Sequence, residues 1–268
     1  MILYVLGSNG YLAHALLNIF KINHVKYKII SKINELTYDL PKEVPKNSIC
    51  INLSSVIGLE CDINKKKTDA INIELNKRLL DINFKKIIFT SSSSVYGNNL
   101  QFCKETSKVN PTNYYTETKL IAEEILLKNK NSCILRLALC FGKSYRFSKS
   151  NFIDHTFDLI NSSKKIEIYT PLNYRPYINV NEAAEYIYKI CKIDNIKGLF
   201  NVGNSELNLN KFQILDLFKK INLQFNYCIN FSIKDVRNYK MNYDKIQNFI
   251  PKNKNSSLEI FKLTYQKY

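Results

Sequence analysis

The chain has 268 residues, 45% hydrophobic and 23% charged, a composition of globular proteins that excludes disordered and fibrous chains. Its 39 Lys and Arg residues outnumber 23 Asp and Glu residues and give a formal net charge of +16. Only five of these cations are Arg, the residue best suited to reading phosphates and bases, and the lysines are scattered. We therefore expect a basic surface that steers small anions, and no nucleic-acid partner.

Seven cysteines occur without a C-x-x-C pair, and several of them lie in apolar runs. They are typical of buried free thiols in a reducing compartment. The three histidines are far apart in the sequence, so we expect no metal site. There is no signal-peptide pattern and no apolar run of the ~18 residues that span a bilayer. These features predict a cytoplasmic protein without a membrane partner.

Apolar segments without polar alternation are typical of parallel strands covered on both faces. Between them, apolar residues recur at helical spacing. The pattern predicts strands at 2–6, 27–30, 49–53, 86–90 and 133–137, and helices from residue 10 onward, at 70–82 and at 114–127. This alternation predicts an α/β fold, a Rossmann-type doubly wound parallel sheet.

The alternation weakens beyond residue 142. We expect helices at 152–160 and 181–191, and strands at 166–169 and 199–202. Residues 1–142 are therefore assigned to a dinucleotide-binding domain. Residues 143–268 mostly form a small substrate-binding lobe, from which a segment near 175–203 returns to the sheet.

A glycine turn, G-x-x-G-x-x-A, joins the first strand to the first helix. Gly7 can make the tight turn, and Gly10 allows a pyrophosphate to approach the backbone. This position at the first strand-helix junction predicts a dinucleotide site. The cofactor-binding residues predicted here are Gly7, Asn9, Gly10, Tyr11 and Leu12.

The end of the second strand bears on the choice of dinucleotide. An acid there usually holds the ribose of NAD, whereas a cation accommodates the 2′-phosphate of NADP. Here Ser31 and Lys32 end the strand, which favours NADPH, with NAD as the alternative. Asp39, followed by Leu40, could accept a hydrogen bond from the adenine amino group.

Tyr115 and Lys119 lie four residues apart at the start of a predicted helix, so they share one face. A nearby ammonium can lower the pKa of a tyrosine from its usual value of about 10 and so prepare it for proton transfer. A hydroxyl from the serine-rich end of the adjacent strand, residues 91–94, can orient a carbonyl. A lone Y-x-x-x-K is weak evidence, but here it follows the glycine turn and the serine-rich strand end in order.

Taken together, these motifs resemble those of the extended short-chain dehydrogenase/reductase family, the nucleotide-sugar epimerases, dehydratases and reductases. The resemblance covers nearly the whole chain. It also includes Asn72 in a helix and the segments 49–55, 136–142, 175–182 and 201–203, the last reading N-V-G.

The resemblance implies roles for residues at matching positions. Tyr115 becomes the general acid, Lys119 holds the nicotinamide ribose, and Ser92 takes the Ser/Thr position, with Ser91 or Ser93 remaining as alternatives. Three further groups are implied: cofactor contacts at Leu53, Ser54, Ser55 and Asn72, a substrate contact at Ser93, and a grip on the diphosphate by Arg175 and Arg237.

Departures from the family pattern narrow the reaction. Ser92-Ser93-Ser94 stands where dehydratases carry Thr-Asp-Glu, so we do not expect dehydration. The segment 31–40 is similar to that of keto reductases such as GDP-fucose synthase. Two positions differ from the family: Leu139 replaces an Asn and Pro176 replaces an Asp.

The favoured hypothesis is an NADPH-dependent reductase of a keto group on a nucleotide-linked sugar. The alternatives are an NAD-dependent epimerase and, from another class, a dinucleotide-sensing Rossmann module. A homodimer is common in the resembling family, and the sequence itself does not decide it.

Overall fold

The computed structural model describes residues 1–145, 147 and 151–266. Its centre is a six-stranded sheet in the order β10-β6-β4-β3-β1-β2, in which every neighbouring pair is parallel. The strands are β1 (Leu3–Leu6), β2 (Tyr27–Ile30), β3 (Ile49–Asn52), β4 (Lys86–Ser92), β6 (Ser132–Leu137) and β10 (Gly198–Val202). The predicted Rossmann-type sheet is confirmed.

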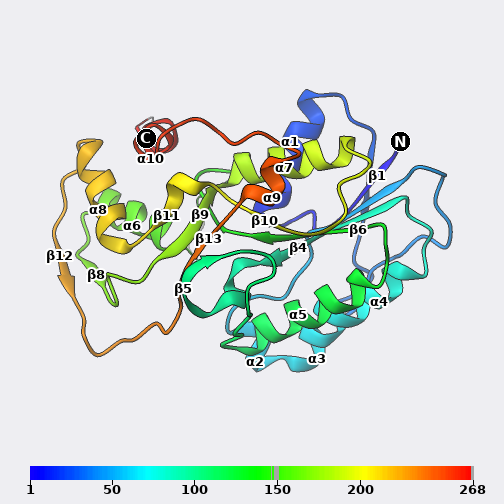
Figure 1. The fold of residues 1–268 in the computed structure, drawn as a ribbon, viewed down its shortest axis with the longest axis horizontal. Helices are drawn as coiled ribbons and strands as arrows, with labels where there is room; N and C mark the ends of the chain where they lie inside the picture. Colours follow the sequence, from blue (N-terminus) through cyan, green and yellow to red (C-terminus); the bar gives the residue numbers. More distant parts are fainter. Residues whose placement is uncertain (146, 148–150, 267–268) are drawn as a thin grey trace.

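Helices cover both faces of this sheet (Figure 1). One face carries α1 (Tyr11–Ile22), α7 (Val180–Lys192) and α9 (Asp244–Gln247). The other carries α2 (Glu60–Ile63), α3 (Lys65–Asp69), α4 (Leu75–Leu80) and α5 (Tyr114–Leu127). A π-turn at Ala70–Glu74 joins α3 to α4, so the helix predicted at 70–82 begins earlier and carries an irregularity. Such turns are frequent at functional sites.

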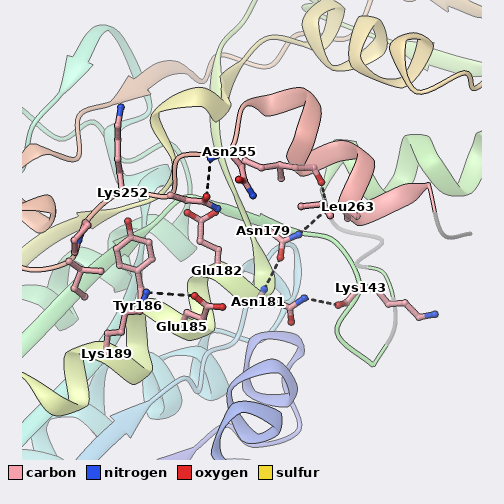
Figure 2. Close-up of a pocket in the computed structure, with 15 residues that line it drawn as sticks. Lys143, Asn179, Asn181, Glu182, Glu185, Tyr186, Lys189, Lys252, Asn255 and Leu263 are labelled. Atoms are coloured by element: carbon pink, nitrogen blue, oxygen red, sulfur yellow. Dashed lines mark hydrogen bonds and ion pairs between the residues drawn. The ribbon is translucent and has the colours of Figure 1, made fainter. Parts of the chain in front are cut away.

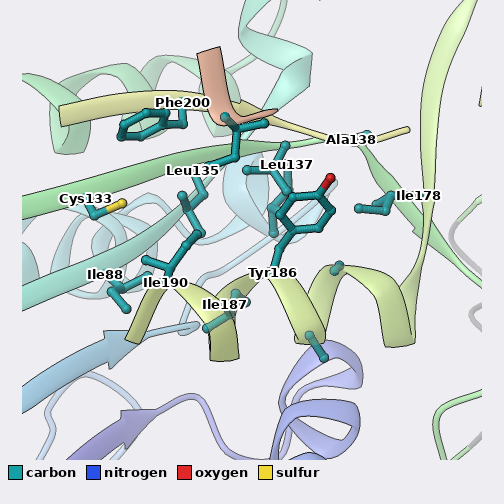
Figure 3. Packing of buried hydrophobic residues seen from close by; sticks show 14 of the residues in the cluster. Ile88, Cys133, Leu135, Leu137, Ala138, Ile178, Tyr186, Ile187, Ile190 and Phe200 are labelled. Carbon is teal, nitrogen blue, oxygen red and sulfur yellow. The ribbon is translucent and has the colours of Figure 1, made fainter. Parts of the chain in front are cut away.

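The core between α7 and the sheet is shown in Figure 3. Ile190 of α7 points toward Leu135 of β6, Tyr186 of the same helix lies beside Leu137, and all four side chains are buried. Each such side chain contributes roughly 1.5–3 kcal/mol by leaving water. This packing anchors the segment that returns from the lobe to the sheet.

The lobe lies at one end of the sheet, at the left of Figure 1. Its helices are α6 (Phe152–Asn161), α8 (Lys211–Lys220) and α10 (Ser257–Tyr265), and their shared core includes Phe157, Phe218, Phe261 and Tyr265. Its strands are β7 (Leu139–Phe141), β8 (Ile166–Ile168), β9 (Arg175–Asn179), β11 (Asn208–Leu209) and β12 (Tyr227–Ile229).

One more strand pair lies between the lobe and the sheet. There β5 (Asn98–Cys103) pairs with β13 (Asn238–Met241), although their first residues are 140 positions apart in the sequence. Short 3-10 turns at Ser93–Tyr96 and Ser205–Leu207 complete the described elements. The pairing of β5 with β13 places β13 beside the serine-rich end of β4, where Ser93 lies 3.1 Å from the Tyr239 hydroxyl.

Candidate active site

The glycine turn forms one wall of a cleft of about 550 Å³ at the carboxyl ends of β1, β2 and β3. This is the point where the strand order reverses, the usual ligand position in such sheets. Eleven residues line it: Gly7, Ser8, Asn9, Gly10, Ile30, Ser31, Lys32, Tyr38, Leu53, Ser54 and Ser55. Eight of the predicted cofactor residues thus share one cleft.

Gly7 has a φ of +76°, and a Cβ there would lie 2.6 Å from the backbone N of Ser54. Only glycine therefore lets β1 turn against the loop after β3. Gly10 lines the cleft and is the N-cap residue of α1. Because no side chain caps the helix, its first N–H groups have no side-chain acceptor. Uncapped N–H groups suit a phosphate.

Ser31 and Lys32 lie exposed on the cleft wall, as predicted for the ribose side. Asp39 and Leu40 do not line the cleft, and Tyr38 does so in their place. The chain reverses direction between Ser31 and Asp39. Asp39 N donates to Ser31 O at 2.9 Å, and the backbones of Lys32 and Tyr38 form an isolated antiparallel β-bridge. Sequence reasoning missed Tyr38 because a reversal without a strand has no periodic signal.

Asn72 lies in the π-turn, and its side chain holds the loop after β3. Its Oδ1 accepts from Val56 N at 2.8 Å, and its Nδ2 donates to Val56 O and to Thr118 Oγ1 at 3.0 Å. Because these bonds use the amide within the chain, Asn72 positions the cleft wall against helix α5. It lies outside the set of cleft-lining residues.

The three predicted catalytic side chains come together where β4 ends and α5 begins. Lys119 Nζ donates to Thr90 O at 2.9 Å and lies 5.8 Å from the centre of the Tyr115 ring. Ser92 lies close enough to Tyr115 for its hydroxyl to lower the pKa of the tyrosine. Thr90 Oγ1 in turn donates to Asn52 O at 3.2 Å, which ties this cluster to the strand bordering the cleft.

The protonation of this cluster differs from the expectation that Lys119 lowers the pKa of Tyr115. Burial raises the pKa of Tyr115 to about 12, although the hydrogen bond from Ser92 lowers it in part. Burial also lowers the pKa of Lys119 to about 7, against an opposing effect of the Glu123 charge. The pKa of Tyr115 is therefore raised, where the sequence predicts that Lys119 lowers it, because burial is the largest effect and Lys119 is not among the causes of the shift.

The four consecutive serines have four different partners. Ser91 donates to Glu123, Ser93 lies 3.1 Å from the Tyr239 hydroxyl, and Ser94 Oγ accepts from Arg175 Nη2 at 3.5 Å. Ser92 is the member whose hydroxyl lowers the pKa of Tyr115. Of the alternatives Ser91, Ser92 and Ser93, this effect on Tyr115 favours Ser92.

Arg175 and Arg237 are brought together by a carboxylate that sequence reasoning did not find. Asp235 Oδ2 accepts from Arg175 Nη1 at 3.3 Å, and Asp235 Oδ1 accepts from Arg237 Nε at 2.7 Å. Burial would raise the pKa of Asp235, but the hydrogen bonds and charges of the two guanidinium groups hold that pKa below its usual value. The Nε of Arg175 is buried without a hydrogen-bond partner among the described residues.

Lys211 adds a third cation to this group. Burial, together with the charges of Arg175 and Arg237, lowers the pKa of Lys211 to about 8, and Asp235 opposes that shift. Its Nζ donates to Tyr169 O at 2.6 Å. The cluster of Arg175, Lys211, Asp235 and Arg237, called here the basic cluster, carries more positive than negative charge and suits a polyphosphate.

A third missed residue, Asp154, links the glycine turn to the lobe. Tyr11 donates its hydroxyl to Gly142 O, and Gly142 N donates to Asp154 Oδ1 at 2.9 Å. Tyr265 of α10 donates to the same carboxylate at 2.6 Å. The Tyr11 side chain thus connects the two parts of the fold.

Another pocket, of about 620 Å³, lies apart from these clusters, between α7, the segment 250–255 and α10 (Figure 2). Asn179 and Asn181 lie on its wall at the start of α7. The side chain of Asn179 caps this helix, because its Oδ1 accepts from Asn181 N at 2.9 Å. Burial raises the pKa of Glu182 on the same wall. No predicted catalytic or cofactor residue lines it.

Among the described residues, no group of three or more His, Cys, Asp or Glu side chains could hold a metal ion. None of the described helices is both long and apolar enough to cross a membrane.

Solved structures share this fold along the whole chain. UDP-glucuronic acid 4-epimerase from Bacillus cereus, in complex with UDP-glucuronic acid and NAD, superposes with a TM-score of 0.81 at 17% identity over 100% of this chain and 98% of that one. RMD from Pseudomonas aeruginosa, complexed with NADPH, gives 0.79 at 15% identity over 100% and 99%.

One curated relative is N-acetyl-alpha-D-glucosaminyl-diphospho-ditrans,octacis-undecaprenol 4-epimerase of Escherichia coli O157:H7. It is 28% identical over 166 residues, which are 59% of this chain and 48% of the relative. The match thus spans about half the length of that relative.

A sequence model of the NAD dependent epimerase/dehydratase family matches residues 3–203. This range contains the glycine turn, the serine-rich end of β4 and the pair Tyr115 and Lys119, which the fold brings together. The chain therefore belongs to the NAD-dependent epimerase/dehydratase family.

Proposed function

We propose that this protein transfers a hydride, with NAD(P) as its cofactor, at a carbon of a sugar carried on a diphosphate. The observation that carries the proposal is the joining of Ser92, Tyr115 and Lys119 at the strand ends that border the glycine-turn cleft. The donor set of the cleft fits a dinucleotide, because uncapped N–H groups, serine hydroxyls and one ammonium line it. When bound, the nicotinamide ring accepts or supplies the hydride.

The chain's own groups divide the remaining work. Tyr115 moves a proton at the sugar oxygen, and Ser92 orients that oxygen. Lys119, whose Nζ donates to Thr90 O, binds the ribose of the cofactor on the same face of α5 as Tyr115. Arg175 and Arg237 hold the diphosphate, and the unpartnered Nε of Arg175 supports this role because a buried donor without an acceptor is costly.

Reduction of a keto sugar with NADPH is the first candidate. Ser31 and Lys32 line the cleft, and its described walls include no carboxylate that would accept from the ribose hydroxyls of NAD. A Tyr115 with a pKa of about 12 is protonated at neutral pH, which is the form that donates a proton to a carbonyl being reduced.

Epimerisation with NAD is the second candidate. It is favoured by the similarity to the curated 4-epimerase and by the shared fold of the UDP-glucuronic acid 4-epimerase. The name of the curated relative also indicates that a polyprenol, as well as a nucleoside, can carry the sugar diphosphate in this family.

A cofactor measurement separates the two candidates. The purified protein is denatured, any released nucleotide is identified, and the protein is titrated with NADPH and NADH in parallel. Empty protein that prefers NADPH supports the reductase. Protein that releases NAD, or prefers NADH, supports the epimerase. Failure to bind any of these nucleotides contradicts the whole proposal.

A further inference from the structure

An apolar groove of about 490 Å³ lies beside the basic cluster. Its walls come from β5, from the turn at 170–173 and from the segment 230–238. Leu100 and Phe231 on these walls are 80% and 82% exposed, and Ile233 and Val236 are also exposed. Large side chains of this kind gathered around one groove indicate a ligand or partner surface.

Exposed apolar surface continues past the rim of the groove. Phe102 lies two residues beyond Leu100 on β5, and Leu172 follows Pro171 of the wall, and both are more than half exposed. The apolar surface therefore extends beyond the groove itself.

Asp235 connects the groove to the basic cluster. It lines the groove, and its carboxylate accepts from both Arg175 and Arg237. On the other side, Arg175 Nη2 donates to Ser94 Oγ at 3.5 Å, two residues beyond Ser92. A diphosphate on the arginines would thus have the catalytic side chains at one end and the apolar groove at the other.

Positive charge accompanies the apolar walls. Lys234 lines the groove, and Lys240 Nζ lies 5.3 Å from the ring centre of Phe102. With the basic cluster, these cations complement a ligand that combines an anionic diphosphate with an apolar group.

Three of the asparagines on the walls use one end of their side-chain amide within the chain, which leaves fewer polar groups that could pair with a nucleotide base. Asn173 Nδ2 donates to Asp235 O at 2.7 Å, Asn230 Nδ2 donates to Glu167 Oε1 at 2.7 Å, and Asn238 Oδ1 accepts from Tyr174 N at 2.9 Å. Recognition of a base depends on polar groups free to pair with it.

We infer that this groove binds the prenyl chain of a polyprenyl diphosphate, so that the substrate sugar is linked to a lipid diphosphate rather than to a nucleoside diphosphate. The inference rests on the proposed function, because it takes Arg175 and Arg237 as the diphosphate site. The prenyl chain would lie on Leu100, Phe231 and Val236 and leave along Phe102.

Equilibrium binding of farnesyl diphosphate, UDP and inorganic pyrophosphate tests the inference on the intact protein. We expect farnesyl diphosphate, kept below its micelle-forming concentration, to bind at least about tenfold more tightly than pyrophosphate or UDP, because its apolar chain leaves water when it enters the groove. The double variant Leu100→Ser and Phe231→Ser should lose this advantage while pyrophosphate binding stays unchanged. The control, Ile22→Ser, replaces a similarly exposed side chain at the end of α1 and should keep it.

Tighter binding of UDP than of farnesyl diphosphate, or a double variant that keeps the advantage, would overturn the inference. If this occurs while turnover still depends on Tyr115, the groove assignment fails and the proposed function stands. If farnesyl diphosphate binds as expected but no sugar diphosphate is turned over, the proposed function fails and the groove stands.

Discussion

Arg136 and Glu123 form a buried ion pair directly behind the candidate active site. Arg136 Nη2 lies 2.7 Å from Glu123 Oε2, both side chains are almost fully buried, and Glu123 also accepts from Ser91. Arg136 Nη1 continues the network to the Tyr96 hydroxyl at 3.0 Å. The pair joins β6 to α5 one helical turn beyond Lys119, so it fixes the helix that carries Lys119.

Replacing Glu123 by Gln should destabilise the fold by about 3–5 kcal/mol, because it leaves the Arg136 charge buried without its counter-charge. Glu124 is exposed on the same helix, and Glu124→Gln should change stability by less than about 0.5 kcal/mol. Urea unfolding of the two variants measures the difference. Equal stabilities would contradict the role given to the pair.

Tyr115→Phe should lower turnover by at least about 100-fold, because it removes the proton donor and keeps the ring. Cofactor binding should remain, which a nucleotide titration checks. Tyr114→Phe is the matched control: Tyr114 donates to Asp69 on α3, away from Ser92. A Tyr115→Phe enzyme as active as Tyr114→Phe would remove Tyr115 from the mechanism.

Lys32→Ala should weaken NADPH binding by about tenfold or more and leave NADH binding nearly unchanged, because only NADPH carries the 2′-phosphate. Lys28→Ala removes an equally exposed ammonium from β2 outside the cleft and should alter neither affinity. Parallel titrations with both nucleotides give the result. Equal losses for the two nucleotides would show that Lys32 does not read the phosphate.

Lys119 should make stability depend on pH. Its pKa in the fold is about 7, below the 10.5 of an exposed lysine, so between these values the unfolded chain binds more protons than the folded one. Stability from this group therefore rises as the pH increases from about 7 to 10.5, and below pH 7 the full penalty of a buried charge applies.

Unfolding curves of the parent protein and of Lys119→Met across pH 6–10 test this. The difference in the free energy of unfolding between the parent protein and Lys119→Met should change with pH in that window. For the exposed control Lys77→Met, the difference from the parent protein should stay constant. A constant difference for Lys119→Met would contradict the low pKa.

Asp235→Asn should tighten binding of inorganic pyrophosphate several-fold, because it removes the negative charge that Arg175 and Arg237 now share. Asp216→Asn, which changes an exposed ion pair on α8, is the control and should have no effect. Weaker binding in Asp235→Asn would mean that the carboxylate positions the arginines for the anion.

Most of the sheet could be predicted from the sequence, since apolar runs mark buried parallel strands. The strand at 27–30 and the helix at 114–127 have their predicted bounds exactly, and the strands at 86–90 and 133–137 are confirmed with small extensions. The short strands β5, β7, β11 and β13 were not predicted, because they are two to six residues long and pair with distant segments.

The site was predictable where a motif fixes its chemistry. The glycine turn and the Tyr115 and Lys119 pair have rigid spacing on one strand or helix. By contrast, Tyr38, Asp154 and Asp235 act through contacts across the fold, and their spacing carries no signal. The pKa of Tyr115 depends on burial, which a motif does not specify. The roles of these residues, and the homodimer, stay predictions.

The strand β10 lies at one edge of the central sheet, and two of its backbone groups are bonded to side chains. Asn201 N donates to Glu105 Oε1 at 2.8 Å, and Leu199 O accepts from Lys245 Nζ at 2.7 Å. An unpaired edge invites another strand and is a route to aggregation. A strand from a second molecule would have to break both bonds to add here, so Glu105 and Lys245 close this edge against sheet extension.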